Sequence, residues 1–170
     1  MFKKNNDPDL LDFEKQKGLI EVENVKCGYP PLNKPILDDV SLVINSGEFV
    51  TILGHSGSGK TTFLRSLAGF EVIQDGYIRI NGMLASTSWL HLPPEKRKIG
   101  FIFQDYALFP HLSVRQNISF GIVGHKNEIK KRADFILDLV GLQKHADRYP
   151  HQLSGGQQQR VAVGRALAPN

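Results

Sequence analysis

The sequence lacks several features that would assign a protein to a specialised class. Cys27 is the only cysteine among 170 residues, so an internal disulfide is impossible and a reducing compartment is expected. No apolar run approaches the ~18–20 residues of a membrane-spanning helix, and no apolar signal segment opens the chain. A net charge of +4 is too small to argue for nucleic acid as a partner. Any membrane role is therefore expected to come through a partner protein.

A histidine-based metal centre is not expected either. The chain has six histidines, and none stands at a ligand-like spacing from the cysteine or from carboxylates. The remaining composition, 41% hydrophobic and 22% charged, is ordinary for a globular protein. A chain of this length has room for one domain with a sizeable core.

The segment from Glu48 to Phe70 has the order strand, glycine-rich turn, helix. The β-branched apolar run Phe49–Leu53 predicts a buried strand, and the helical spacing after the turn ends at Gly69. The turn fits the pattern G-x-x-x-x-G-K-[ST] of a phosphate-binding loop. The residues of this loop and the helix start are Gly54, His55, Ser56, Gly57, Ser58, Gly59, Lys60, Thr61 and Thr62.

Each residue type in this loop has a physical reason. Glycines let the backbone curl, so that successive N–H groups point inward around an anion. The helix adds the positive end of its dipole. Lys60 supplies a full charge for the β- and γ-phosphates, and the hydroxyl of Thr61 suits Mg²⁺, which prefers oxygen ligands. The pattern therefore predicts a nucleotide-phosphate site.

The remaining segments predict strands before and after this loop, and helices towards the end of the chain. Asn81-Gly82 is a turn signal that ends one strand of an antiparallel pair. The run Lys98–Phe103 predicts a second buried strand, and Gln104 follows it where open α/β sheets place ligand groups. The other predicted elements are a polar leader over 1–17, strands over 18–28 and 36–44, a polar loop over 92–97 and an amphipathic helix over 128–142.

A second glycine-rich helix start lies near the carboxyl end. Ser154 is expected to cap a helix over 157–168 that turns Val161, Ala162 and Leu167 inward. Such a start is a second candidate anion site. Its residues are Leu153, Ser154, Gly155, Gly156 and Gln157.

Together these segments resemble the nucleotide-binding subunits of ABC (ATP-binding cassette) transporters. The glycine loop matches the family's Walker A motif, the 153–157 segment matches its signature motif, and Gln104 matches its Q-loop. Tyr29 stands where the family has an aromatic ring that stacks on adenine. The resemblance runs from about Leu19 to Asn170 and is similar in detail to importer ATPases, particularly those for iron(III) and similar small solutes.

The resemblance implies an α/β fold of the P-loop NTPase type, with an antiparallel β subdomain and a helical subdomain that carries the signature. The cassette would occupy 18–170, with its helical subdomain at about 105–160. ATP and Mg²⁺ are the implied cofactors, with Lys60 and Gln104 as catalytic residues, and Thr61 and Gln104 near the metal. The signature residues would face the ATP of a second ATP-binding subunit, paired head to tail.

The implied partners also include transmembrane permease subunits and, indirectly, a solute-binding protein, but no nucleic acid. The protein would act at the cytoplasmic face of the cell membrane. Catalysis would consist of charge stabilisation and the positioning of a water in line with the phosphate.

One departure from the family pattern stands out. The family has an apolar strand ending in Asp-Glu shortly after the signature helix, and the sequence ends at Asn170 before it. The sequence is therefore expected to be a carboxy-terminally truncated cassette. Two hypotheses remain, an importer ATPase subunit or a nucleotide-binding module without hydrolytic activity. A chromosome-maintenance ATPase is excluded because no coiled-coil heptads separate Thr61 from Leu153.

Overall fold

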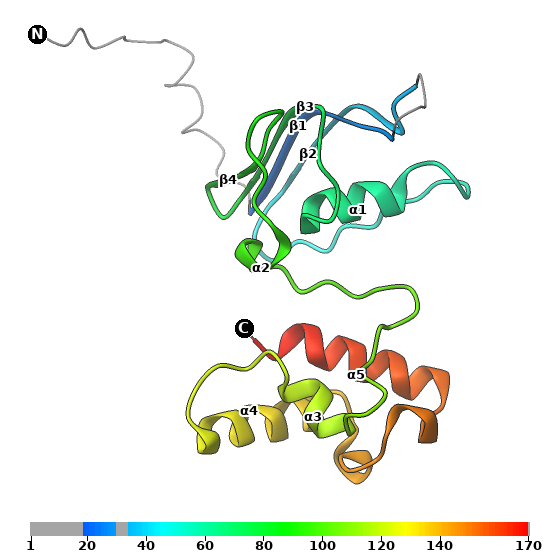
Figure 1. The fold of residues 1–170 in the computed structure, drawn as a ribbon, viewed down its shortest axis with the longest axis vertical. Coiled ribbons are helices and arrows are strands. Elements are labelled where there is room, and N and C mark those ends of the chain that lie inside the picture. The colour runs from blue at the N-terminus through cyan, green and yellow to red at the C-terminus, as the bar shows by residue number, and fades with distance from the viewer. Residues whose placement is uncertain (1–18, 30–33, 170) are drawn as a thin grey trace, which may run out of the picture. The chain divides into compact units, whose positions relative to one another are not determined.

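The computed structural model describes residues 19–29 and 34–169, which form two compact units (Figure 1). Unit 1 runs to Ile99 and unit 2 begins at Gly100, and each is described by itself. The polar leader predicted over 1–17 lies outside the described residues.

Unit 1 is built on an antiparallel sheet of four strands in the order β2-β1-β3-β4. This confirms the strands predicted around positions 18–28, 36–44 and 77–80. The turn between β3 and β4 has positive φ at Asn81 (50°) and Gly82 (75°), as the Asn-Gly signal predicts. The strands are β1 (Ile20–Cys27), β2 (Leu37–Ile44), β3 (Asp75–Ile80) and β4 (Met83–Ser86).

One long helix, α1 (Lys60–Ala68), belongs to unit 1 and ends as predicted at Gly69, which has a φ of 87° (Figure 1). Its side chains Phe63 and Leu67 join the buried residues of the sheet in one core. Because the core holds the inner face of α1, the start of the helix is fixed relative to β1 and β2. The sheet residues of this core include Val22, Val25, Cys27, Leu37, Ile78, Ile80 and Ala85.

The two apolar runs predicted as buried strands, Phe49–Leu53 and Lys98–Phe103, are not strands in the structure. Phe49 is 95% exposed and Leu53 is 87% exposed. An extended segment becomes a strand only when its N–H and C=O groups pair with a neighbour, and within the described residues no strand pairs with either run. Only scattered side chains from the two runs pack on the core, among them Ile52 and Ile99.

The segment predicted as a polar loop over 92–97 contains a short helix, α2 (Pro94–Arg97), and Arg97 at its end is buried. The guanidinium of Arg97 donates to backbone carbonyls from three other parts of unit 1, and burial lowers its pKa to about 10. Its hydrogen-bond partners are the carbonyls of Ser66, Leu67, Ala85 and Leu92, the hydroxyl of Ser86 and Nδ1 of His91.

Unit 2 consists of helices packed on their own core, which includes Val114, Ile118, Ile136, Leu137, Leu142 and Val161. Ser154 caps the last helix, as predicted, and Ser113 caps α3 in the same way. The helix predicted over 128–142 runs instead from Lys126 to Leu139, and Gly141 beyond its end takes a φ of 65°. The elements are α3 (Val114–Ser119), α4 (Lys126–Leu139), α5 (Gly155–Leu167) and the 3-10 helices η3 (Gln143–His145) and η4 (Pro150–Gln152).

Leu167 does not turn inward on α5 as predicted. Val161 and Ala162 are buried, but 42% of Leu167 is exposed, because it lies on the side of the helix away from the core. No helix of the described residues is long and apolar enough to cross a membrane.

Candidate functional site

The start of α1 leaves several backbone donors available. The first backbone hydrogen bond at the helix start runs from the N–H of Phe63 to the carbonyl of Gly59, and no side chain caps the helix. The N–H groups of the preceding first turn therefore have no acceptor within the helix. The first turn also carries no acidic residue. These donors, with the positive end of the helix dipole, favour an anion at this point.

Glycine is required where the loop enters α1. Gly59 is buried with a φ of 88°, which L side chains rarely adopt. A Cβ at this position would lie 3.1 Å from Cδ2 of Leu37 and 3.2 Å from the carbonyl oxygen of Ile36. Gly57 also has positive φ (81°), although the space beside it is open. The tight loop therefore depends on backbone conformation at Gly57, and on both conformation and close packing at Gly59.

Lys60 turns its ammonium group back over the loop. Its Nζ donates to the carbonyl of Gly54 at 2.8 Å and to that of His55 at 2.7 Å, and it lies 3.4 Å from Oγ of Ser58. The loop residues from Gly54 to Ser58 are exposed. A full positive charge and the free N–H groups of the first turn thus belong to one short, accessible segment. This arrangement suits a phosphate group better than it suits a neutral ligand.

Tyr29 lies beyond the end of β1 and is 41% exposed, so its ring is not packed in the core of that strand. A hydrogen bond with the carboxylate of Glu71 is the main cause that raises the pKa of Tyr29, while a hydrogen bond with Thr62 lowers it. The tyrosine hydroxyl is therefore held near the first turn of α1. Its exposed ring is available to a ligand bound at that turn.

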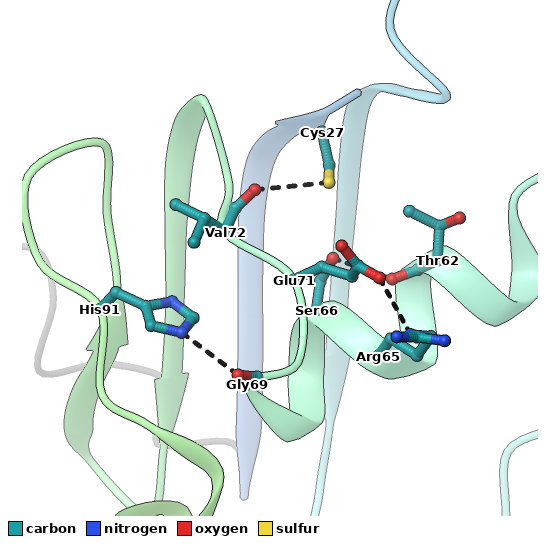
Figure 2. A network of polar contacts seen from close by, with 8 residues as sticks. All are labelled: Cys27, Thr62, Arg65, Ser66, Gly69, Glu71, Val72 and His91. Atoms are coloured by element: carbon teal, nitrogen blue, oxygen red, sulfur yellow. Dashed lines mark hydrogen bonds and ion pairs between the residues drawn. The ribbon is translucent and has the colours of Figure 1, made fainter. Parts of the chain in front are cut away.

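A polar network fixes α1 to the segment that follows it (Figure 2). Nε of Arg65 lies 2.9 Å from Oε1 of Glu71, and the hydroxyl of Ser66 donates to the carbonyl of Thr62 at 2.8 Å. Cys27 is buried beside this network, its thiol donating to the carbonyl of Val72, and burial raises its pKa. The cysteine is thus a core residue, and its protonated thiol is a poor nucleophile.

Gln104 belongs to unit 2, and the structure places it in an exposed turn rather than at the end of a strand. The prediction of a strand end was wrong because the run before it has no pairing strand. Just after it, Tyr106 and Ala107 have φ values of 63° and 44°. The guanidinium of Arg165, on α5, donates to both of their carbonyls at 2.9 and 2.6 Å, and lies 5.3 Å from the ring centre of Phe109. The loop after Gln104 is therefore tied to α5.

The signature segment forms a capping box at the start of α5. The N–H of Gln157 donates to Oγ of Ser154 at 3.3 Å, and the N–H of Ser154 donates to Oε1 of Gln157 at 2.9 Å. Gly155 and Gly156 are exposed, with open space where a Cβ would stand, and Leu153 is buried in the core of unit 2. The exposed serine and glycines thus present backbone and a hydroxyl group without bulky side chains.

Sequence patterns missed the side chains that support these segments. Arg165 and Asn117 hold the loop after Gln104, and His145 contacts Gln157. Asn117 is fully buried and bonds the backbone of Phe109 in both directions. No spacing signal marks these residues, because their contacts join positions 8, 12 and 58 apart that follow no common pattern. Among the described residues, no group of three or more His, Cys, Asp and Glu is placed to hold a metal ion.

Comparison with known proteins decides the family. The family model described as ABC transporter matches residues 37–170. The chain belongs to the ABC transporter family. The fold of this family, mixed α/β with an antiparallel sheet, agrees with the predicted fold class. The family binds and hydrolyses ATP, which agrees with a phosphate-binding loop at the start of α1.

Two relatives of this ABC transporter chain illustrate how close the match is. The spermidine/putrescine import ATP-binding protein PotA of Pseudomonas fluorescens is 52% identical, over 88% of this chain and 42% of its own length. The sulfate/thiosulfate import ATP-binding protein CysA of Nocardia farcinica is 48% identical, over 88% of this chain and 44% of its own length. The chain therefore spans less than half the length of these relatives. Their names refer to spermidine, putrescine, sulfate and thiosulfate rather than to iron(III).

One similar protein of known structure was determined as a dimer, so it bears on how such chains assemble. The ATP-binding cassette MJ0796, determined as a dimer in a post-hydrolysis state bound to ADP and Pi, superposes with a TM-score of 0.75 at 36% identity. The match covers 88% of this chain and 69% of that one. A dimeric ABC cassette is thus a structural neighbour of this chain.

Proposed function

We propose that this chain is part of the ATP-binding subunit of an ABC importer, which couples ATP binding and hydrolysis to solute transport. The observation that carries the proposal is the uncapped start of α1, where the ammonium of Lys60 and the free N–H groups of the first turn belong to one exposed loop. Phosphates of a nucleotide satisfy both kinds of donor at once.

Roles for individual residues follow from this arrangement. Lys60 is assigned to the β- and γ-phosphates, and the exposed ring of Tyr29 to the adenine base. The oxygens of Thr61, on the first turn of α1, and of Gln104 suit a hard cation, so these two residues are assigned to Mg²⁺. Gln104 is also assigned to the attacking water. The remaining loop residues from Gly54 to Thr62 contribute backbone donors and the shape of the loop.

The signature segment is assigned to the ATP of a second ATP-binding subunit. Its exposed serine and glycines offer donors without bulky side chains, and a dimeric ABC cassette is a structural neighbour. Permease subunits complete the proposed assembly and hold it at the cytoplasmic face of the membrane, with a solute-binding protein acting indirectly. The names of the relatives favour polyamines or sulfate as the solute over the iron(III) suggested by the sequence resemblance.

The experiment that tests the nucleotide site is a calorimetric titration of the full-length protein with ATP, ADP and AMP, with and without Mg²⁺. Because the donors of the loop address phosphates, affinity is expected to rise with phosphate number, by about tenfold or more from AMP to ATP. Equal affinity for AMP and ATP would contradict the assignment of the loop. Phosphate release measured in the same preparation separates the ATPase from a module that binds ATP without hydrolysing it.

A further inference from the structure

His145, the last residue of η3, contacts the signature segment through one ring nitrogen and leaves the other without a partner. Its Nε2 lies 3.2 Å from the side-chain nitrogen of Gln157. Its Nδ1 is buried and has no hydrogen-bond partner among the described residues. A polar ring atom without a partner in the interior is unfavourable, so the ring calls for an explanation.

The direction of the hydrogen bond between the two side chains follows from the capping box. The N–H of Ser154 donates to Oε1 of Gln157, which fixes the carboxamide with its NH₂ group towards His145. An NH₂ group only donates, so Nε2 of His145 must accept. A neutral imidazole that accepts at Nε2 carries its proton on Nδ1. The unpartnered atom is therefore an N–H donor.

We propose that His145 is a positioning residue for the signature motif. Its Nε2 lone pair holds the carboxamide of Gln157 in the one orientation that completes the capping box with Ser154. In that orientation Oγ of Ser154 accepts from the N–H of Gln157, and its own hydrogen remains free to donate to an acceptor outside the chain. This inference rests on the proposed function, in which that acceptor is a phosphate of the partner subunit's ATP.

A purely structural role does not account for the histidine. The backbone bonds of η3 need no side chain, since the N–H of His145 bonds to Leu142 and its carbonyl accepts from Arg148. The neighbouring side chains Leu142 and Ala146 are apolar and belong to the core of unit 2. A leucine at position 145 would leave no unpartnered donor. The histidine therefore leaves an unpartnered donor that an apolar residue would not, and its bond to Gln157 accounts for its presence.

The first test reads the ring directly and needs no nucleotide. Two-bond ¹H–¹⁵N correlation spectra of the full-length protein in alkaline buffer report which imidazole nitrogen of His145 carries the proton, with His145→Gln used for assignment. We expect protonated Nδ1 and unprotonated Nε2. Protonated Nε2 would overturn the inference whatever the protein does with ATP.

The second test compares two substitutions at this position in the ATPase assay. His145→Leu removes the acceptor, and we expect kcat to fall about threefold to tenfold with KM for ATP unchanged and the melting temperature equal or higher. His145→Gln restores an acceptor near Nε2 and should recover most of the turnover. Unchanged kcat in His145→Leu, alongside a clear loss in Ser154→Ala, would overturn the inference. If Ser154→Ala had no effect, the proposed role of the signature would fail instead.

Discussion

The two glycine-rich helix starts of this protein, at α1 and at α5, differ in how their unpaired backbone N–H groups are treated. At α1 the residue before the helix is Gly59 in a left-handed conformation, and no side chain caps the free N–H groups. At α5 that residue is Ser154 in an extended conformation, and a capping box with Gln157 gives the N–H groups of both residues a side-chain acceptor. The start of α1 has no side-chain acceptor for its backbone donors, whereas the start of α5 has two.

This difference shows that glycine content alone does not define an anion site. Gly59 is needed because its backbone conformation and the contact with Ile36 exclude a side chain. Gly155 and Gly156 have ordinary helical geometry and open space around them, so they serve to keep a surface free of side chains. The start of α1 is therefore suited to the proposed phosphate, and the start of α5 offers a face that another molecule can approach closely.

The largest expected effect concerns the charge at the start of α1. Lys60→Ala should weaken ATP binding by about 1.5–3 kcal/mol, roughly tenfold to more than a hundredfold, because it removes a charge-assisted contact with the phosphates. Isothermal titration calorimetry measures the affinity of the variant for ATP. Lys126→Ala is the matched control, since Lys126 is the first residue of α4 just as Lys60 is the first of α1. Equal losses in the two variants would remove Lys60 from the site.

The next prediction compares the glycines of the two starts. Gly59→Ala should destabilise the protein by about 1–3 kcal/mol, because alanine pays for positive φ and meets Leu37 and Ile36. Gly156→Ala should be neutral or stabilising by up to about 1 kcal/mol, since the position is helical and open. Chemical denaturation of both variants measures the change in the free energy of unfolding that each substitution causes. Similar stabilities would show that the two loops do not differ in backbone strain.

A smaller effect is expected at the cap of α5. Ser154→Ala should cost about 1 kcal/mol of stability, because the N–H of Gln157 loses its acceptor. Ser154→Thr keeps the hydroxyl oxygen and should recover most of that stability. Ser56→Ala, in the exposed loop before α1, is the control in which no cap is lost, and its melting temperature should stay at the wild-type value. A drop as large as that of Ser154→Ala would contradict the contrast between the two starts.

The smallest effect separates the ring of Tyr29 from its hydroxyl. Tyr29→Phe loses only the hydrogen bonds of the hydroxyl, to Glu71 and Thr62, and should change ATP affinity by less than about threefold. Tyr29→Ala also loses stacking on the base, worth about 1–3 kcal/mol, while its melting temperature should hold because the ring is exposed. Fluorescence titration with ATP and with inorganic triphosphate distinguishes base from phosphate contacts. A large loss in Tyr29→Phe would mean that the hydroxyl, not the ring, serves the ligand.

Local signals in the sequence predicted the helix starts and the hairpin of this protein well. Ser154 caps the helix that its position predicts, and Asn81-Gly82 turns the chain between β3 and β4. In each case the residue itself sets the backbone conformation or supplies the cap. Such information is contained within four or five neighbouring residues.

Features that depend on distant partners were predicted poorly. The runs Phe49–Leu53 and Lys98–Phe103 have the composition of strands, but a strand also needs a neighbour, which the run itself does not specify. Arg97 and His145 appear as ordinary polar positions in the sequence, although the structure buries the first and joins the second to Gln157. The Walker A and signature positions were recognisable because their spacing is local, and the roles assigned to them stay predictions.

The buried guanidinium of Arg97 makes separate parts of unit 1 lose their structure together. It donates hydrogen bonds to carbonyls at the end of α1, in β4 and in the segment before α2. If any one of these segments opens, the buried guanidinium loses part of its hydrogen bonding while it remains among the other two. Local fraying is thereby suppressed, and the three segments belong to one cooperative folding unit. The end of α1 consequently cannot unravel without disturbing the β4 edge of the sheet, which gives the glycine-rich loop at the other end of α1 a rigid support.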